Sequence, residues 1–263
     1  DQGPEPFGGR GHRPEDPSEG LSMNKVALIT GAAKRVGACI ARTLHANDYV
    51  IALHHHTSAE AARELSLDLN RRRSESCVAV AADLMDPEAC AAVVARTVDA
   101  FGGLDLLVNN ASVYAATPLA DLDEQDFAAT MAVNLRAPLL LAKHAAPLLR
   151  ERRGAIVNIT DIYADRPTEA HPIYVASKAG LAALTKSLAL DLAPAVRVNA
   201  VAPGAILWPE DGDIERRERI LARIPAARPG TAEDVANAVA YLAGAAYVTG
   251  ETIAVDGGRS LTI

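Results

Sequence analysis

Short apolar runs alternate with amphipathic stretches along most of the chain. The apolar runs are rich in β-branched residues and predict buried strands at 26–30, 49–53, 77–81, 104–109, 155–160, 196–201 and 252–255. The stretches between them predict helices at 36–47, 59–72, 87–101, 123–150, 173–192 and 233–242, with a break near Pro138 in the fourth. This alternation predicts an α/β fold, a doubly wound, seven-stranded parallel sheet with helices on both faces.

A short leading segment precedes this pattern. Residues 1–22 are rich in glycine, proline and charged residues and offer almost no apolar surface, so we expect them to form a disordered tail. The strand and helix pattern then continues to the end of the chain without a linker. We therefore expect one domain at 23–263, an ordinary size for a single α/β unit.

Composition argues against several classes of partner. The chain has 26 basic and 33 acidic residues, a net charge of −7 and no dense basic block, so we do not expect a nucleic-acid partner. No apolar run reaches the roughly 18 residues that a membrane span needs.

Cys39, Cys77 and Cys90 lie in apolar segments without C-x-x-C spacing or cationic neighbours. They predict reduced core thiols of a cytoplasmic protein rather than a catalytic cysteine.

A glycine turn joins the first predicted strand to the first helix. It reads Thr30-Gly-Ala-Ala-Lys-Arg-Val-Gly37, and this position is where a dinucleotide pyrophosphate meets the amides of a helix N-terminus. Gly31 would allow the tight turn, and Gly37 would let the helix approach the sheet. An ordinary strand-to-helix turn also needs glycine, but the location in the first βα unit favours a dinucleotide site.

The end of the second strand helps to choose the cofactor. An acidic residue about 20 positions after the first glycine usually binds the ribose hydroxyls of NAD, but Leu53-His-His-His-Thr-Ser58 contains no acid. His56, Thr57 and Ser58 are able to donate hydrogen bonds to a 2′-phosphate, and Arg35 adds a cation, so NADPH is favoured. Two other interpretations of the three histidines stay open. They could bind a metal, although successive side chains of a strand point to opposite faces and diverge, or they could simply be the solvated end of a strand.

Polar residues also follow the third and fourth strands. Asp83 is suited to hydrogen-bond an adenine edge, to cap the helix that begins near Pro87, or to do both. Asn109-Asn-Ala-Ser112 falls at the carboxyl edge of the predicted sheet, where ligands bind in open α/β folds.

A phenol and an amine lie four residues apart on the predicted helix at 173–192. This spacing puts Tyr174 and Lys178 on one helix face. A lysine beside a tyrosine favours the phenolate, so we expect the pKa of Tyr174 to be lowered toward neutral pH. Tyr174 is therefore a candidate general acid.

From Lys25 to Ile263 the chain resembles the short-chain dehydrogenase/reductase family. The resemblance is carried, in the family's order, by the glycine turn, Asn109-Asn-Ala-Ser112, Met131-Ala-Val-Asn134, Tyr174-Val-Ala-Ser-Lys178 and Val201-Ala-Pro-Gly204. It implies a Rossmann-type sheet, Tyr174 as catalytic acid/base, Lys178 on the nicotinamide ribose and Asn134 holding a water in the proton relay. It also implies a homotetramer or dimer. The implied cofactor contacts are Gly31, Lys34, Arg35, Val36, Gly37, His55, His56, Thr57, Ser58, Asp83, Leu84, Asn110, Ala111, Ser112, Thr160, Tyr174, Lys178, Pro203, Gly204 and Ile206.

Two departures from the family pattern point to a subgroup. Arg35 stands where a third glycine is usual, and Asp161 stands where the family's catalytic serine is usual. Together with the His-x-His strand end, Tyr114 and the ending 255–261, they resemble pteridine reductases and dihydromonapterin reductases. In these enzymes the arginine meets both phosphate and pterin, and an aromatic ring stacks on the pterin. The implied substrate contacts are Arg35, Ser112, Tyr114, Asp161, Tyr174, Leu207 and Trp208.

Other interpretations of these residues stay open. Asp161 could simply cap a turn after the fifth strand, and Trp208 could pack a lid rather than touch substrate. The stretch with Arg166, Pro167 and His171 is expected to border the pocket. The favoured function is NADPH-dependent reduction of a small-molecule pterin or folate. The alternatives are a 3-oxoacyl-type carbonyl reductase of the same family and a non-catalytic NADP(H)-binding protein.

Overall fold

The computed structural model describes residues 24–206 and 214–262. Its strands are β1 (Lys25–Ile29), β2 (Tyr49–His55), β3 (Cys77–Ala81), β4 (Leu106–Asn109), β5 (Ala155–Ile159), β6 (Arg197–Pro203) and β7 (Thr252–Val255). Its helices are α1 (Arg35–Ala46), α2 (Ala59–Arg72), α3 (Pro87–Phe101), α4 (Glu124–Met131), α5 (Ala137–Arg152), α6 (Pro172–Leu192), α7 (Ile214–Leu221) and α8 (Ala232–Gly244). Short helical turns are η1 (Ala132–Arg136), η2 (Ile162–Ala164) and η3 (Arg259–Leu261). The predicted tail at 1–22, Leu207 and Trp208 lie outside the described residues.

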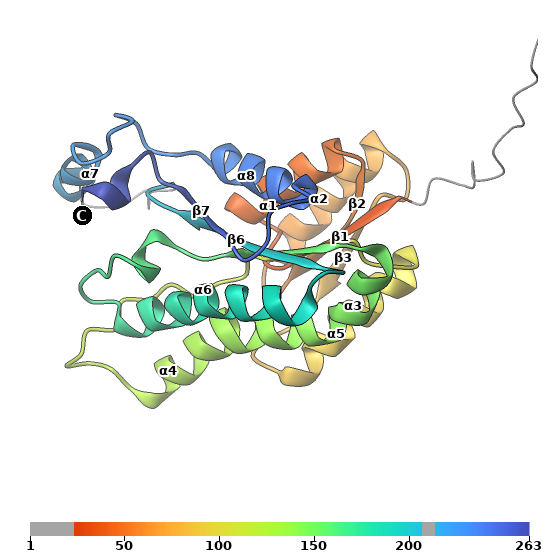
Figure 1. Cartoon of the computed structure of the whole chain (residues 1–263), viewed down its shortest axis with the longest axis horizontal. Helices are drawn as coiled ribbons and strands as arrows, with labels where there is room; N and C mark the ends of the chain where they lie inside the picture. The colour runs from red at the N-terminus through yellow and green to blue at the C-terminus, as the bar shows by residue number, and fades with distance from the viewer. Residues whose placement is uncertain (1–23, 207–213, 263) are drawn as a thin grey trace, which may run out of the picture.

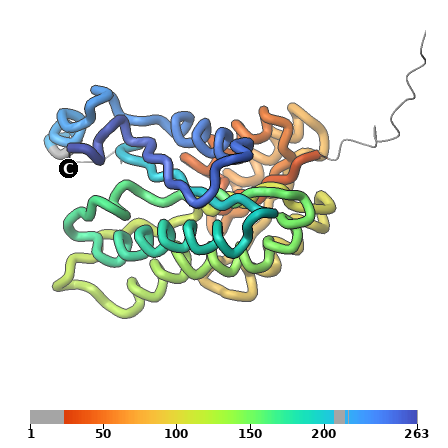
Figure 2. Tube along the Cα trace, viewed as in Figure 1, coloured from red at the N-terminus to blue at the C-terminus, as the bar shows by residue number. Residues whose placement is uncertain are grey.

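All seven strands form one parallel sheet in the order β3-β2-β1-β4-β5-β6-β7. Helices α1, α2 and α8 cover one face, and α3, α5 and α6 cover the other (Figures 1 and 2). The predicted doubly wound parallel sheet is therefore confirmed. The chain leaves β1 toward β2 and β3 on one side and later adds β4 on the other side, so the sheet has a switch point beside β1.

Strand β1 shows how the sequence builds both halves of the core. Ala27 and Ile29 pack into the cluster under α1, α2 and α8, whereas Val26 and Leu28 pack into the cluster under α3, α5 and α6. Successive strand side chains point to opposite faces, so a strand covered on both faces must be apolar throughout. Leu28 and Ile29 are fully buried, and each such side chain contributes roughly 2 kcal/mol to folding.

Helix α3 corrects one prediction about its start. The side chain that accepts the amide hydrogen of Glu88 at the helix N-terminus belongs to Asp86, with Pro87 next to it. Asp83 instead accepts from the amide of Met85 at 2.9 Å, a local turn before the helix. Asp86 is placed directly before the first helical residue, which is where a capping carboxylate reaches the orphan amides, so Asp83 is not the helix cap.

The cysteines are unpaired and lie in or against the core. Cys77 and Cys90 are buried, Cys39 is half-buried, and burial raises the pKa of the Cys77 thiol to about 11. The prediction of core thiols is confirmed. No helix within the described ranges combines the length and the apolarity that crossing a membrane requires.

Candidate active site

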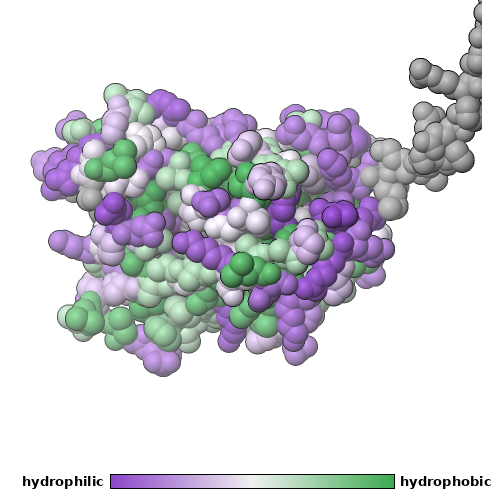
Figure 3. Space-filling view, in the orientation of Figure 1, coloured by the Kyte–Doolittle hydropathy of each residue, from purple (hydrophilic) through white to green (hydrophobic). Residues whose placement is uncertain are grey.

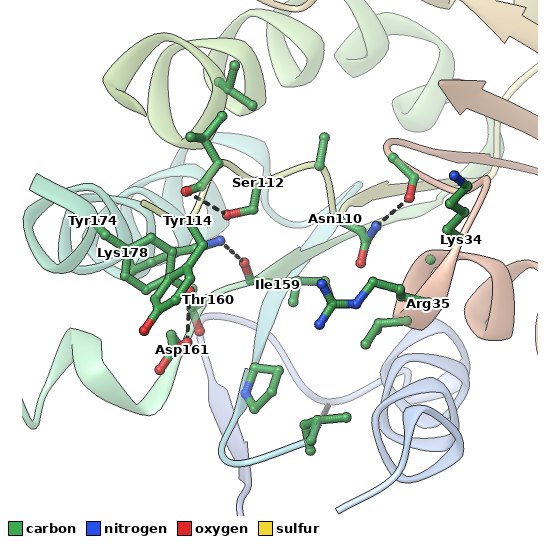
Figure 4. A pocket seen from close by; sticks show the side chains of 18 of the residues that line it. Lys34, Arg35, Asn110, Ser112, Tyr114, Ile159, Thr160, Asp161, Tyr174 and Lys178 are labelled. Atoms are coloured by element: carbon green, nitrogen blue, oxygen red, sulfur yellow. Dashed lines mark hydrogen bonds between the residues drawn. The ribbon is translucent and has the colours of Figure 1, made fainter. Parts of the chain in front are cut away.

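A cleft of about 1020 Å³ opens at the carboxyl ends of the strands around the switch point (Figure 4). Every predicted site residue that the structure describes lines this cleft except Asn134. Those residues are Gly31, Lys34, Arg35, Val36, Gly37, His55, His56, Thr57, Ser58, Asp83, Leu84, Asn110, Ala111, Ser112, Tyr114, Thr160, Asp161, Tyr174, Lys178, Pro203, Gly204 and Ile206. Arg166, Pro167 and His171 do not line it, contrary to expectation.

Two positions of the glycine turn have no room for a side chain. Gly31 has a left-handed φ of +61°, and a Cβ there would lie 2.9 Å from the Cα of Ala111. A Cβ on Gly37 would lie 2.3 Å from the carbonyl oxygen of Gly31. Asn110 closes the back of the turn by donating its side-chain amide to the carbonyl oxygens of Thr30 and Gly31. Both glycines therefore let the chain pack closely between β1 and α1, the position where a pyrophosphate binds in such folds.

His54, which sequence reasoning did not select, holds this turn in place. Its Nδ1 accepts the amide hydrogen of Gly31 at 3.1 Å, and its Nε2 donates to the carbonyl oxygen of Ala82 at 3.2 Å. Burial lowers the pKa of His54 to about 4, so the imidazole is neutral at pH 7 and is able to accept a hydrogen bond. One buried side chain thus joins the turns that follow β1 and β3.

Arg35 projects from the start of α1 into the cleft (Figure 4). Its φ is 54°, the left-handed region in which glycine is the usual residue. A non-glycine residue there costs on the order of 1 kcal/mol, and such strain is concentrated at functional sites. No acidic side chain in the described residues forms an ion pair with Arg35. The guanidinium is therefore available to a ligand.

The end of β2 offers donors without a carboxylate of its own. His55 is buried, with its Nδ1 donating to the carbonyl oxygen of His56 at 3.3 Å. His56 is exposed, and its Nε2 lies 3.8 Å from Asp83 Oδ2. Thr57 and Ser58 line the cleft next to it. In the parts of the chain that the structure describes, no three His, Cys, Asp or Glu side chains converge as metal ligands.

Asn134 lies on η1, a π-helical turn between α4 and α5. Its side chain donates to the carbonyl of Val113 and to Ser177 Oγ and accepts from the amide of Val113. Pro138 has no N–H for the Asn134 carbonyl four residues earlier, which explains why the helix widens before Pro138. The side chain therefore fixes the segment at 113.

Tyr174 and Asp161 form the chemical centre of the cleft (Figure 4). Tyr174 Oη donates to Asp161 Oδ2 at 2.8 Å, and Asp161 Oδ1 accepts from the amide of Tyr163 at 2.9 Å. Asp161 therefore caps η2, as one interpretation expected, and also binds the phenol. Burial raises the pKa of the Asp161 carboxyl, while hydrogen bonds from Tyr163 and Tyr174 and the charges of Lys178 and Arg259 oppose that shift.

The expected lowering of the Tyr174 pKa is wrong for the protein without ligand. Burial and the adjacent Asp161 carboxylate raise the pKa of the phenol above its ordinary value. Lys178 lies with its Nζ 5.7 Å from the centre of the Tyr174 ring and donates to the carbonyl oxygen of Ile159 at 2.9 Å. Complete burial lowers the pKa of Lys178 to about 8. Tyr174 therefore stays protonated, as a proton donor must.

Tyr114 stands beside the phenol of Tyr174. Their rings meet edge to face with centres 4.7 Å apart. Tyr114 also stacks on His171, whose Nδ1 donates to the carbonyl oxygen of Ala115 at 2.9 Å and whose Nε2 lies 3.1 Å from Tyr114 Oη. His171 therefore acts on the cleft through Tyr114. Ser112 lines the cleft at the same side.

Known proteins match this chain over most of its length. A family model described as "Enoyl-(Acyl carrier protein) reductase" matches residues 31–260. The chain belongs to the short-chain dehydrogenase/reductase family. It is 37% identical over 244 residues to 3-oxoacyl-[acyl-carrier-protein] reductase FabG of Staphylococcus aureus (strain Mu50), covering 90% of this chain and 99% of that one. Pteridine reductase 1 of Leishmania tarentolae is 36% identical over 279 residues, covering 90% and 96%. Nodulation protein G of Rhizobium sp. (strain N33) is 36% identical over 241 residues, covering 89% and 96%.

Membership of the short-chain dehydrogenase/reductase family makes this protein an oxidoreductase that uses a nicotinamide cofactor. The residues present fit such a cofactor. The close-packed glycine turn precedes the N-terminus of α1, and the cleft runs from that turn to Tyr174 and Lys178. The cofactor would supply the hydride, and the side chains of the cleft would supply the proton.

Proposed function

We propose that this protein is an NADPH-dependent pterin reductase. It would convert a 7,8-dihydropterin to the tetrahydropterin, with dihydrofolate and oxidised pterins as further candidates. The observation that carries this proposal is the hydrogen bond of 2.8 Å between Tyr174 Oη and Asp161 Oδ2, at the position where the family pattern has serine. The proposal depends on the different chemistry that the carboxyl group of Asp161, in place of a serine hydroxyl, gives this position.

The pair is suited to protonate a ring nitrogen. Reduction of the N5=C6 bond adds hydride to carbon and a proton to nitrogen, and no alkoxide forms that a serine hydroxyl would stabilise. When Asp161 is protonated, it donates to Tyr174 Oη while Tyr174 passes its own proton to N5. Each proton is transferred along one hydrogen bond, from Asp161 to Tyr174 Oη and from Tyr174 Oη to N5. The products are an N–H bond, a neutral phenol and the Asp161 carboxylate. Burial favours this competent state because it raises the pKa of the Asp161 carboxyl.

Two further side chains support a flat heterocyclic substrate. Arg35 keeps a strained backbone and reaches into the cleft, where a planar guanidinium is able to contact both phosphate and the pterin edge. Tyr114 places an aromatic ring 4.7 Å from the ring of Tyr174, within reach of a planar ligand. Pteridine reductase 1 is among the relatives at 36% identity.

NADPH is proposed over NADH because of the end of β2. A carboxylate there would repel a 2′-phosphate, whereas the strand ends at His55 and is followed by His56, Thr57 and Ser58. Of these, His56 is exposed and its imidazole is able to donate.

The second candidate is a 3-oxoacyl-type carbonyl reductase. The identity of 37% with a 3-oxoacyl-[acyl-carrier-protein] reductase and the description of the family model favour it. Its reaction builds negative charge on a carbonyl oxygen, which the serine hydroxyl of the family pattern would stabilise at any pH, whereas Asp161 would stabilise it only when protonated. Substrate preference therefore separates the two candidates.

We also propose a cytoplasmic homotetramer. Three unpaired cysteines fit a reducing compartment. Exposed apolar side chains gather over α4 and the loop before it, including Leu119, Leu122 and Phe127, and such a patch suits subunit contact (Figure 3). Size-exclusion chromatography with light scattering tests the assembly, and a monomer at micromolar concentration would contradict it.

A single screen of NADPH oxidation tests the function. The substrates are a 7,8-dihydropterin, dihydrofolate, a quinonoid dihydropterin and an acetoacetyl thioester. We expect turnover with the dihydropterin, and we expect Asp161→Ala and Tyr174→Phe to abolish it while NADPH binding stays near normal. Wild-type rates from either variant would defeat the assignment, and turnover of the thioester alone would establish the second candidate.

A further inference from the structure

Arg259 is a buried cation at the substrate end of the cleft. It begins η3, directly after the turn that follows β7, and only 8% of its surface is exposed. The turn is held by Asp256, whose carboxylate accepts the amide hydrogens of Gly258 and Ser260. Arg259 lines the same cleft as Asp161 and Tyr174, although neither the glycine turn nor α6 carries it.

The charge of Arg259 has no direct ion-pair partner in the described residues. Its Nη2 donates to Tyr163 Oη at 3.0 Å, and its guanidinium carbon lies 5.6 Å from the centre of the Tyr163 ring. Its Nε is buried and makes no hydrogen bond. Burying a guanidinium without a carboxylate partner costs free energy, so we expect a nearby group to interact with its charge.

The contacts of Tyr163 connect Arg259 to Asp161. The hydroxyl of Tyr163 holds the guanidinium, and its amide donates to Asp161 Oδ1 at 2.9 Å. One residue of η2 is therefore held from both sides. We propose that Arg259 is a positioning residue for Asp161, which fixes η2 through Tyr163 and sets by its charge how readily Asp161 releases its proton to Tyr174. The catalytic consequence, though not the contact, rests on the proposed function.

Four groups face the Asp161 carboxyl from three elements. Tyr174 and Lys178 come from α6, Tyr163 from η2 and Arg259 from η3. Burial raises the pKa of Asp161, the hydrogen bonds of Tyr163 and Tyr174 lower it, and the charges of Lys178 and Arg259 lower it further. Without Arg259, one of the effects that lower the pKa of Asp161 is lost, so the carboxyl should keep its proton to a higher pH. Arg217 of α7 lines the same cleft and stays in place in each variant below.

The test is a direct titration of Asp161 in the ligand-free protein. Carbon-13 NMR of protein labelled at the aspartate carboxyl carbons follows the midpoint, and the Asp161→Asn spectrum assigns the signal. Arg259→Met should raise the midpoint, because the carboxyl loses a cation that favours its ionised form. Arg259→Lys keeps the charge and should stay close to wild type. An unchanged midpoint in Arg259→Met would overturn the proposal, whatever happens to its melting temperature.

A second variant covers the case in which Arg259→Met does not fold. Tyr163→Phe removes only the hydroxyl that holds the guanidinium, and it should move the Asp161 midpoint in the same direction by less. A midpoint identical to wild type in this variant would overturn the proposal as well. If a dihydropterin is turned over, the high-pH limb of kcat should move upward with the midpoint.

The outcome also separates this proposal from the proposed function. The titration needs no substrate, so a shifted midpoint without pterin turnover would support Arg259 as a positioning residue and defeat the pterin reaction. Robust pterin turnover with an unmoved midpoint would defeat the role of Arg259 alone.

Discussion

The ring of Tyr114 stacks on the ring of His171, with centres 4.5 Å apart and an angle of 20° between their planes. The contact joins the segment after β4 to the start of α6 and holds Tyr114 next to Tyr174. An aromatic ring held in advance loses less freedom when a flat substrate binds.

His171→Ala should therefore weaken binding of the dihydropterin. The KM should rise by about tenfold, the effect of roughly 1.4 kcal/mol, while the Kd of NADPH stays unchanged. Tyr114→Phe is the matched control, because it keeps the ring and removes only the hydroxyl near His171 Nε2. Steady-state kinetics check the result. A KM for dihydropterin that His171→Ala leaves at the wild-type value would show that the stacking has no role in binding.

Lys178→Met should abolish turnover and yet stabilise the ligand-free protein at pH 7. Burial lowers the pKa of Lys178 from its ordinary value of 10.5 to about 8, so the folded state binds this proton more weakly than the unfolded state. The charged amine thus costs a few kcal/mol below pH 8, since each pKa unit corresponds to about 1.4 kcal/mol. The lost hydrogen bond to Ile159 offsets part of the gain.

The advantage of Lys178→Met should shrink as pH rises from 8 to 10.5, where the wild-type lysine becomes neutral in both states. Denaturant unfolding at several pH values measures it. If Lys178→Met were less stable than wild type at pH 7, and by an amount that does not change with pH, the argument would be contradicted.

Arg35→Gly should separate stability from function. Glycine adopts the φ of 54° at position 35 without strain, so the variant should be as stable as wild type or more stable. It also removes the guanidinium from the cleft, and we expect kcat/KM for dihydropterin to fall by about 100-fold, the order expected for lost contacts to an arginine. Thermal unfolding and kinetics test both parts. Unchanged kinetics would remove Arg35 from the substrate site.

His54→Ala should weaken NADPH binding, because the glycine turn loses the acceptor for the amide of Gly31. We expect a loss of about tenfold in a fluorescence titration and a destabilisation of about 1–3 kcal/mol. His56→Ala is the control: it should leave stability unchanged and reduce the preference for NADPH over NADH.

The low pKa of His54 also gives a pH dependence. The pKa lies near 4 in the folded state against 6.5 ordinarily, so the wild-type protein should lose stability as pH falls from 6.5 toward 4. The slope should be smaller in His54→Ala. Equal slopes in the two proteins would argue against a neutral, hydrogen-bonded imidazole.

Local pattern in the sequence was sufficient for the sheet and for most of the cleft. Strand ends of parallel units meet at one edge, so motifs at Gly31, Asn110 and Tyr174 had to converge once the strands were recognised. The helix cap at Asp86 and the π-helical turn at Asn134 were missed because several carboxylates and one proline allowed more than one local arrangement.

Long-range contacts account for the remaining omissions. Among three adjacent histidines, only the register of β2 against β1 decides that His54 reaches Gly31. Arg259 meets Tyr163 across 96 positions of the chain, a distance over which spacing carries no signal. The pKa of Tyr174 depends on burial and on Asp161, and the four-residue spacing to Lys178 says nothing of either.

The most direct test of the central claim compares Asp161→Ser with the wild-type protein on two substrates. The measured quantity is the ratio of kcat/KM for a 7,8-dihydropterin to kcat/KM for an acetoacetyl thioester, both with NADPH. The carboxyl that binds Tyr174 Oη at 2.8 Å should make this ratio large in wild type, and serine should lower it by about 100-fold or more, which is about 2.7 kcal/mol. A wild-type enzyme that prefers the thioester, with a ratio that serine leaves unchanged, would contradict the account.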